Sequence, residues 1–181
     1  FLIDEKFEII RQLIAIDDTV DNSQVKAWEV LIDDLKKSNL SQLNQNLYIA
    51  IEYSLPIDGM GIDVLIAGID SDKNKKVYII EAKQWVDSNI YEYNFGEYRN
   101  NSLTLHPQIQ VSRHQTAFVD YLNIGEKYKV EPSVYMKNLS QGGIKKLIEL
   151  NPLLNTSNVL VFKELDEIIK AIGMDLIASE P

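Results

Sequence analysis

The segment that most constrains the fold of this chain is residues 77–85 (VYIIEAKQW), an apolar strand-like run that carries a carboxylate and an ammonium group. Side chains of a strand alternate between the two faces of a sheet, so Glu81 and Lys83 point to the same side. Burying an acid and a base together is costly unless they have strong partners or a chemical role. The sequence therefore predicts a functional site on this strand.

A second acid, Asp63, lies on the preceding apolar run, residues 61–69 (GIDVLIAGI). The turn between the two runs is short and polar, which predicts an antiparallel pair of strands. Two acids and a lysine on neighbouring strands suggest a divalent-metal site for phosphodiester chemistry, because one or two Mg²⁺ ions can activate water and stabilise the phosphate. Mg²⁺ needs only one or two carboxylates besides water and substrate phosphate.

The carboxylates of Asp63 and Glu81 are the predicted metal ligands, and the backbone carbonyl of Ala82 is a further candidate ligand. Lys83 is expected either to orient the attacking water or to stabilise the phosphate. The residues alone do not decide between these two roles.

The composition indicates one globular domain of 181 residues, with 45% hydrophobic and 25% charged side chains. No apolar run approaches the roughly 20 residues that span a membrane. The chain has no cysteine, which excludes disulfides, thiolate zinc sites and cysteine nucleophiles. A cytoplasmic location is expected. Because the chain starts with Phe1 and ends on the linker-like residues 178–181 (ASEP), it is expected to be a domain of a longer protein.

The net charge of −9 argues against a free-standing non-specific nucleic-acid binder, which would be basic. The charge is uneven, however. Residues 1–58 carry 11 acidic and 5 basic side chains, whereas residues 73–146 carry 7 acidic and 11 basic ones. The basic bias therefore falls in the segment that includes and follows the strand with Glu81 and Lys83.

Hydrophobic periodicity and turn signals predict the remaining elements. Helices are expected over 1–16, 23–37 (capped by Asn22 or Ser23), 107–122, 144–150 (after a Gly142-Gly143 break) and 164–172 (stopped by Gly173), and strands over 47–55, 61–69, 76–85, 133–139 and 159–162, with no element assigned over 86–105. The first three strands are expected to form an antiparallel meander. The predicted fold is one α/β domain with a mixed central sheet flanked by helices.

Asp63, then 17 intervening residues, then Glu81-Ala82-Lys83 at the end of an apolar strand resembles the PD-(D/E)XK nuclease superfamily. The resemblance implies a restriction-endonuclease-like core of order αβββαβ over residues 23–139, with an N-terminal helical extension (1–22) and a C-terminal extension (140–181). It also implies Mg²⁺ or Mn²⁺ as cofactor and Asp63, Glu81 and Lys83 as catalytic residues.

A glutamate on the first core helix completes the site in many members of that superfamily. Glu29 is the natural candidate here for a catalytic and metal-binding role, and Glu52 on the first strand is its rival.

Three polar residues are candidate substrate contacts. Gln84 follows the lysine, as polar residues often do in this superfamily. Gln110 and His114 resemble the Gln-three-residues-Tyr motif of exonuclease-like members, with histidine in place of tyrosine. Together with Arg113 they share one helix face, which meets either a phosphate or solvent, and solvent is favoured. His106, which precedes Pro107, is expected to pack against or cap that helix.

The wider pattern resembles one bacterial subgroup, nuclease-like domains that precede a P-loop helicase-type NTPase domain. Members usually have a basic residue just before the Ile-Asp pair, whereas this chain has Gly59-Met60-Gly61. No phosphate-binding glycine-rich loop occurs in the 181 residues, so any NTPase is expected beyond Pro181.

The sequence thus predicts Mg²⁺-dependent hydrolysis of phosphodiester bonds in nucleic acid, with DNA favoured, by a module of a larger protein. The alternative is a catalytically inactive module that binds nucleic acid or protein and positions a downstream NTPase. The acidic N-terminal third and the missing basic residue favour that alternative. A third interpretation is a structural domain in which Glu81 and Lys83 form only a buried ion pair.

Overall fold

The computed structural model describes residues 9–13, 20–38, 48–55, 60–69, 72–92, 98–99, 102–103, 105–125, 127–151 and 159–175. The helix expected over 1–16 is described only at residues 9–13, which are helical. The turn at 56–59 and the linker-like end at 178–181 lie outside the described residues. No helix in the described ranges is long and apolar enough to cross a membrane.

The described elements are α2 (Asn22–Lys37), β1 (Tyr48–Ser54), β2 (Gly61–Ile69), β3 (Lys75–Ala82), α3 (Asp87–Glu92), β4 (Tyr98–Arg99), β5 (Ser102–Leu103), α4 (Pro107–Leu122), β6 (Tyr128–Tyr135), α5 (Gln141–Glu149), β7 (Leu160–Phe162) and α6 (Leu165–Asp175). The main sheet has the order β1-β2-β3-β6-β7. β1, β2 and β3 pair antiparallel, whereas β6 runs parallel to β3 and β7 parallel to β6. The predicted fold class, an α/β domain with a mixed sheet and the order αβββαβ, is confirmed.

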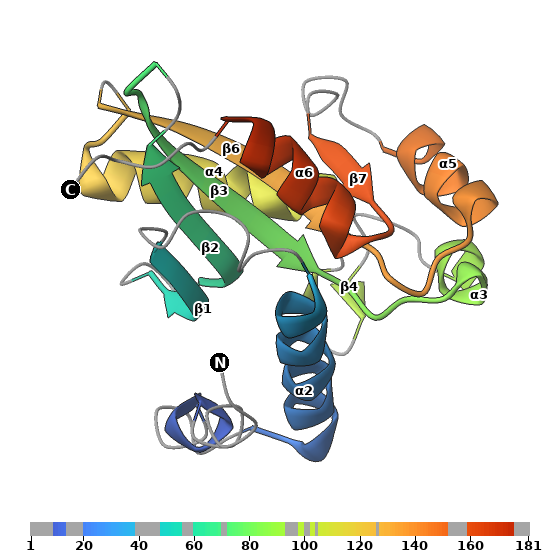
Figure 1. Ribbon diagram of the computed structural model, residues 1–181. Coiled ribbons are helices and arrows are strands. Elements are labelled where there is room, and N and C mark those ends of the chain that lie inside the picture. The colour runs from blue at the N-terminus through green and yellow to red at the C-terminus, as the bar shows by residue number, and fades with distance from the viewer. Residues whose placement is uncertain are drawn as a thin grey trace.

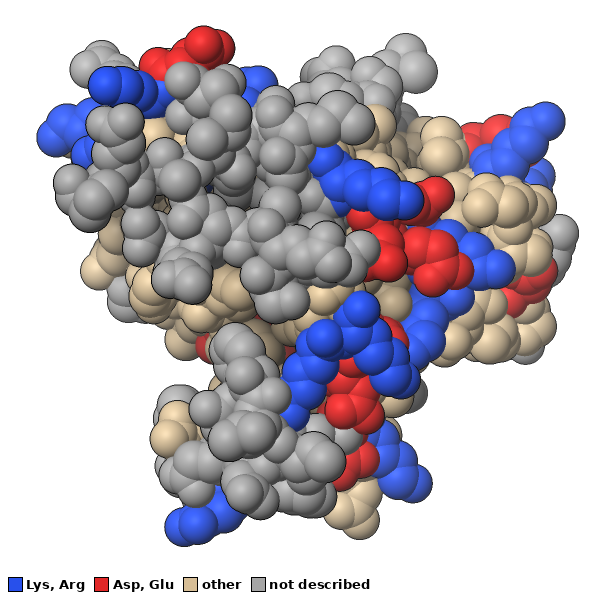
Figure 2. Space-filling view, viewed as in Figure 1, with Lys and Arg blue, Asp and Glu red and all other residues tan. Residues whose placement is uncertain are grey.

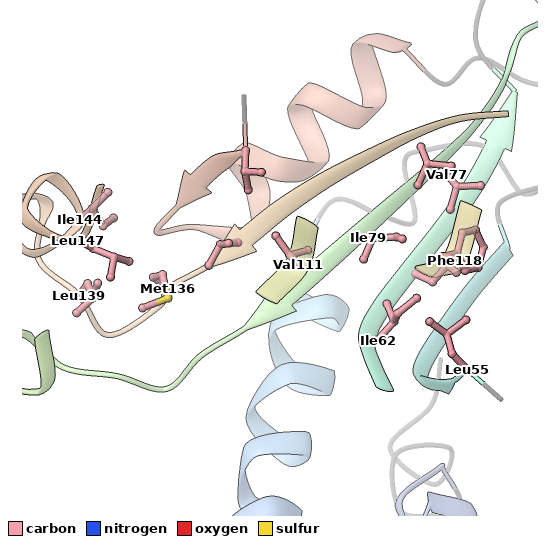
Figure 3. Packing of buried hydrophobic residues seen from close by; sticks show 14 of the residues in the cluster. Leu55, Ile62, Val77, Ile79, Val111, Phe118, Met136, Leu139, Ile144 and Leu147 are labelled. Atoms are coloured by element: carbon pink, nitrogen blue, oxygen red, sulfur yellow. The ribbon is translucent and has the colours of Figure 1, made fainter. Parts of the chain in front are cut away.

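The sheet has helices on both faces, with α4 against one face and α2 and α6 against the other (Figure 1). β3 carries the alternation that produces these two layers. Val77 and Ile79 pack in one cluster with residues of α4, as Figure 3 shows for Val111 and Phe118. Tyr78 and the other side chains of the opposite face pack with Leu31 of α2 and Ile168 of α6. Since β3 is covered on both faces, its central residues from Val77 to Ile80 are all apolar or aromatic.

One end of α2 is fixed to the carboxyl end of β6 by a polar cluster. The carboxylate of Asp34 accepts hydrogen bonds from the Tyr135 hydroxyl at 2.9 Å and from Lys137 Nζ at 2.6 and 2.8 Å. Burial and the Asp34 carboxylate raise the pKa of Tyr135, so its hydroxyl stays a donor. This cluster places α2 beside the carboxyl end of β3 (Figure 1).

Three predicted helix boundaries are wrong. The N-cap of α2 is Asp21, not Asn22 or Ser23, because the Asp21 carboxylate accepts the backbone N–H groups of Ser23 and Gln24 at 2.8 and 2.9 Å. α5 includes both glycines that were expected to precede it, because Ser140 caps the helix at Gly143 N–H (3.0 Å). α6 continues through Gly173 to Asp175.

Gly143 lies in helix α5 at a position where a side chain would collide with Asp87. A Cβ at this position would lie 2.2 Å from Asp87 Oδ1 of α3. The same oxygen accepts the backbone N–H of Ser140 at 2.9 Å. The glycine therefore permits the close contact between α3 and the start of α5.

The strand expected over 133–139 is also corrected, since β6 spans Tyr128–Tyr135 and contains Pro132. β7 pairs with β6 only over residues 133–135, so Pro132 lies where β6 lacks this second strand neighbour. The third strand ends at Ala82, three residues earlier than expected. The segment 86–105, to which no element was assigned, contains α3, β4 and β5.

His106 caps α4, as expected from its place before Pro107. Its buried ring accepts the backbone N–H of Gln108 at Nδ1 (3.3 Å), and Nε2 lies 2.9 Å from the Leu147 carbonyl of α5. Gln108 is buried beside it, donating to the Val159 carbonyl at 2.7 Å and accepting from Asn151 at 2.8 Å. The start of α4 is thus hydrogen-bonded to the α5–β7 part of the chain.

The His106 contacts predict a pH-dependent contribution to stability. Burial lowers the pKa of His106, although the Leu147 carbonyl opposes the shift. The unfolded chain therefore binds a proton at His106 near pH 6.5, whereas the folded protein does so only at lower pH. The contribution of the neutral ring to the free energy of unfolding is complete above pH 6.5 and is lost as the pH falls. We expect His106→Asn, which keeps a capping side chain, to lower the free energy of unfolding by about 1–3 kcal/mol at pH 7.5.

Urea denaturation of both proteins at pH 7.5, 6.0 and 5.0 checks this expectation. The gap between wild type and variant should narrow as the pH falls. A constant gap across the series would contradict the role assigned to the neutral ring.

Candidate active site

Three carboxylates lie in a row across β1, β2 and β3. The pairs Ile51–Val64 and Tyr53–Ile62 flank Glu52 and Asp63, so these two acids are opposite each other. Val64 pairs with Ile80, and the same antiparallel register continued by one residue places Glu81 opposite Asp63 on the other side. Like charges in opposite positions destabilise a sheet. A row of this kind therefore needs compensation.

The ladder between β2 and β3 ends at this row. Beyond the Val64–Ile80 pair, Asp63 Oδ2 accepts the backbone N–H of Ala82 at 2.7 Å. A carboxylate thus takes the place of a strand carbonyl. Burial and the nearby charge of Glu81 raise the pKa of Asp63 well above its usual value.

Glu81 is almost fully buried, with 1% of its side chain exposed, and it contacts two basic side chains. Lys83 Nζ lies 2.6 Å from Oε1, and His114 Nδ1 of α4 lies 3.2 Å from Oε2. The second contact is close but poorly aligned, and both of its atoms have no hydrogen-bond partner among the described residues. Burial acts to raise the pKa of Glu81, but His114 and Lys83 outweigh it, so the pKa is lowered.

Lys83 lies just after β3 and is held by its backbone as well as its side chain. Its backbone N–H donates to the Tyr135 carbonyl of β6 at 2.9 Å. Burial acts to lower the pKa of Lys83, but Glu81, Asp63 and Glu52 outweigh it, so the pKa is raised. Lys83 is therefore a fixed cation among three acids.

An open cleft of about 220 Å³ borders Glu52, Asp63 and Lys83. It is lined by Gln24, Ala27, Trp28, Leu31, Glu52, Asp63, Ala82, Lys83 and Gln84. One wall is a single face of α2, and the other side is formed by the ends of the strands. Two of the three carboxylates, Glu52 and Asp63, border this open space together with Lys83, and a space of this size can admit a phosphate and a cation.

Glu29, the sequence candidate for the third acid, is not among the residues that line the cleft. The lining residues of α2 repeat every three or four positions, and Glu29 follows Trp28 by one residue, which turns it about 100° around the helix. Glu52, its rival, does line the cleft. Asp63, Ala82, Lys83 and Glu52 thus line the cleft, and Glu81 joins them through its contact with Lys83, whereas Glu29 does not line it.

The candidate substrate contacts occupy different places. Gln84 lines the cleft, and its side-chain oxygen accepts from Asn138 at 3.1 Å. His114 is buried against Glu81, so the expectation of a solvent-facing position is wrong for this residue. Arg113 is exposed as expected, and Gln110 is half-buried one turn before His114. The polar face of α4 therefore reaches the acid row through His114.

Two features of the site, one contact and one backbone conformation, were not predicted from the sequence. Trp28 Nε1 donates to Glu52 Oε1 at 2.5 Å, and Glu52 itself has a positive φ of 52°. A non-glycine residue in this conformation costs on the order of 1–3 kcal/mol and is typical of functional sites. The other such residues in the described ranges, Lys73 and Asn123, lie outside the strands. Hydrophobic periodicity in the sequence carries no signal for either feature.

The donor atoms suit a hard divalent cation. In the described part of the chain, no group of three His, Cys, Asp or Glu side chains is arranged to hold a metal ion. Mg²⁺ does not require such a cage, because it keeps several waters and binds through one or two carboxylates. Among the described residues, Glu81 Oε2 has no hydrogen-bond partner, although His114 Nδ1 lies 3.2 Å away, and three acids surround one lysine, so the site carries excess negative charge.

Comparison with models of known protein families gives no match, and comparison with curated protein sequences gives none. Among solved structures, one described as the EndoMS–dsDNA2 complex gives a TM-score of 0.36 at 15% identity, over 74% of this chain and 42% of that chain. A repair endonuclease from Pyrococcus abyssi gives 0.31 at 20% identity, over 63% of this chain and 36% of that one. The chain spans about two fifths of the length of these proteins. Similarity at this level says nothing about activity.

The crowded acids predict a cost to stability. We expect Asp63→Asn to raise the free energy of unfolding by about 1–2 kcal/mol at pH 7.5 in EDTA, because it removes one of three adjacent negative charges while its side-chain oxygen still accepts from Ala82. Urea denaturation measures the difference. A variant less stable than wild type would show that the Asp63 charge stabilises the fold.

Proposed function

We propose that this domain is a metal-dependent nuclease whose active site consists of Asp63, Glu81 and Lys83. The observation that carries the proposal is a buried Glu81 that is paired with Lys83 and lies opposite Asp63, while Asp63, Ala82 and Lys83 line an open cleft. A carboxylate pair of this kind is unfavourable for folding and suits a bound cation.

Mg²⁺ or Mn²⁺ would be held by Asp63, Glu81 and the Ala82 carbonyl. When bound, such an ion supplies an activated water and stabilises charge on the phosphate. Lys83 is positioned to donate to a phosphate oxygen, because its ammonium group is fixed by Glu81 and partly open to the cleft, with 23% of its side chain exposed. Gln84, on the same wall, supplies a polar group next to the lysine.

DNA is the proposed substrate, and the domain is proposed to act as a module of a larger protein. Basic and acidic side chains are interspersed on the face of the molecule that Figure 2 shows. A mixed surface of this kind supports weak, salt-sensitive contact with phosphates. We extend the proposal to a downstream helicase-type NTPase on the strength of the sequence resemblance.

We expect Lys83→Ala and Asp63→Ala each to lower the rate of Mg²⁺-dependent cleavage by at least about 100-fold, because each removes a charge at the reacting phosphate. The measurement is cleavage of end-labelled double-stranded DNA, single-stranded DNA and RNA in Mg²⁺, in Mn²⁺ and in EDTA. The three substrates also test the preference for DNA.

Lys146→Ala is the matched control, since Lys146 is a half-exposed lysine on α5 that pairs only loosely with Glu149, at 3.9 Å. It should cleave like wild type. Full cleavage by both active-site variants, with their folds intact by circular dichroism, would refute the assignment.

A catalytically inactive binding module is the second candidate function. The observation that favours it is the Lys83–Glu81 ion pair, which already occupies one carboxylate oxygen of the proposed metal ligand Glu81. An inactive module predicts DNA or protein binding without cleavage in any divalent cation. Binding that persists with Asp63→Ala while wild type shows no cleavage would select it.

A further inference from the structure

We infer that Glu52, held by Trp28, is the third carboxylate of the site and binds the cation through its coordinated water. This inference rests on the proposed metal-dependent site and concerns residues that the Asp-Glu-x-Lys pattern does not include.

The backbone of β1 departs from a regular strand at Glu52 alone among its residues. Glu52 has a φ of 52°, and it drops out of the pairing between its neighbours Ile51 and Tyr53 and β2. Nothing in the packing of β1 requires an acid here, since Ile51 and Tyr53 pack in the two apolar clusters of the sheet. The strained residue is the one that reaches the cleft.

Both oxygens of Glu52 have definite positions. Oε1 accepts the Trp28 indole N–H at 2.5 Å, and Trp28 is buried with 4% exposure. Oε2 leans over the start of β2, since a Cβ at Gly61 would lie 3.7 Å from it. One oxygen is thus used to fix the side chain, and the other lies near Gly61, two residues before Asp63 on β2.

A water-mediated role follows from the arrangement of the acids. No three acidic or imidazole side chains within the described ranges converge on a common point, so Glu52 does not complete a direct ligand cage. Mg²⁺ keeps several of its waters, and a carboxylate on the wall of the cleft can accept their hydrogen bonds. Residues that act on a metal in this way typically change its affinity 10- to 100-fold when replaced.

Trp28 is then a positioning residue. Its ring forms part of the same wall, and its N–H is the donor that orients Glu52. The α2 helix that carries it is anchored near its C-terminal end by Asp34. The sequence neighbour Glu29 lacks this geometry and is not expected to affect the cation.

The test is titration calorimetry of the protein with Mn²⁺ at pH 7.5. We expect Glu52→Gln to weaken Mn²⁺ affinity 10- to 100-fold, because the amide oxygen still accepts from Trp28 while the charge is lost. Trp28→Phe should weaken it less, by several-fold, because Glu52 keeps its charge but loses its fixed orientation. Thermal unfolding in EDTA confirms that both variants are folded.

Two further variants make the outcome specific. Glu149→Gln, the same change at an exposed glutamate on α5, controls for net charge and should leave the affinity unchanged. Asp63→Asn should abolish binding. Wild-type affinity in Glu52→Gln with binding lost in Asp63→Asn overturns this inference alone, whereas a wild-type protein that binds no Mn²⁺ overturns the proposed function as well.

Discussion

The hydrogen bond from the Ala82 N–H to the Asp63 carboxylate is the interaction on which the candidate site depends. It lies where the β2–β3 ladder ends, so the strands need not supply a carbonyl to Ala82 at this point. A side chain that replaces a ladder carbonyl satisfies the buried N–H and brings a charge to the strand end. The Ala82 carbonyl and Lys83 come next along the chain, and both residues line the cleft.

Electrostatic balance is the second constraint. Glu52, Asp63 and Glu81 share one row, and Lys83 is the cation in contact with it. The pKa of Glu81 is lowered because His114 and Lys83 contact it. The pKa of Asp63 is raised because burial and the Glu81 charge outweigh Lys83 and the Ala82 N–H. A site built only for stability would not retain Asp63, and this is the physical reason to assign it a ligand.

Much of the fold followed from local signals. β2 and α4 have the predicted bounds. β2 is marked by an apolar run that begins after a glycine, and α4 by a proline in its first turn. β6 was placed too late because Pro132 and its polar neighbours interrupt the pattern, while its real support is parallel pairing with β3. That pairing joins residues about fifty positions apart, and no local pattern reveals it.

The site divides along the same line. Asp63, Glu81 and Lys83 could be found because they interrupt apolar strands, where a charge is conspicuous. Glu52 was harder to rank than Glu29, since both lie in amphipathic segments and only the cross-strand register and the Trp28 indole separate them. His114 was placed in solvent because its helix neighbours are polar, yet the Glu81 charge makes a buried imidazole favourable. Where two interacting residues come from different helices or strands, the residue type can suggest a candidate, but only the packing of the elements decides its role.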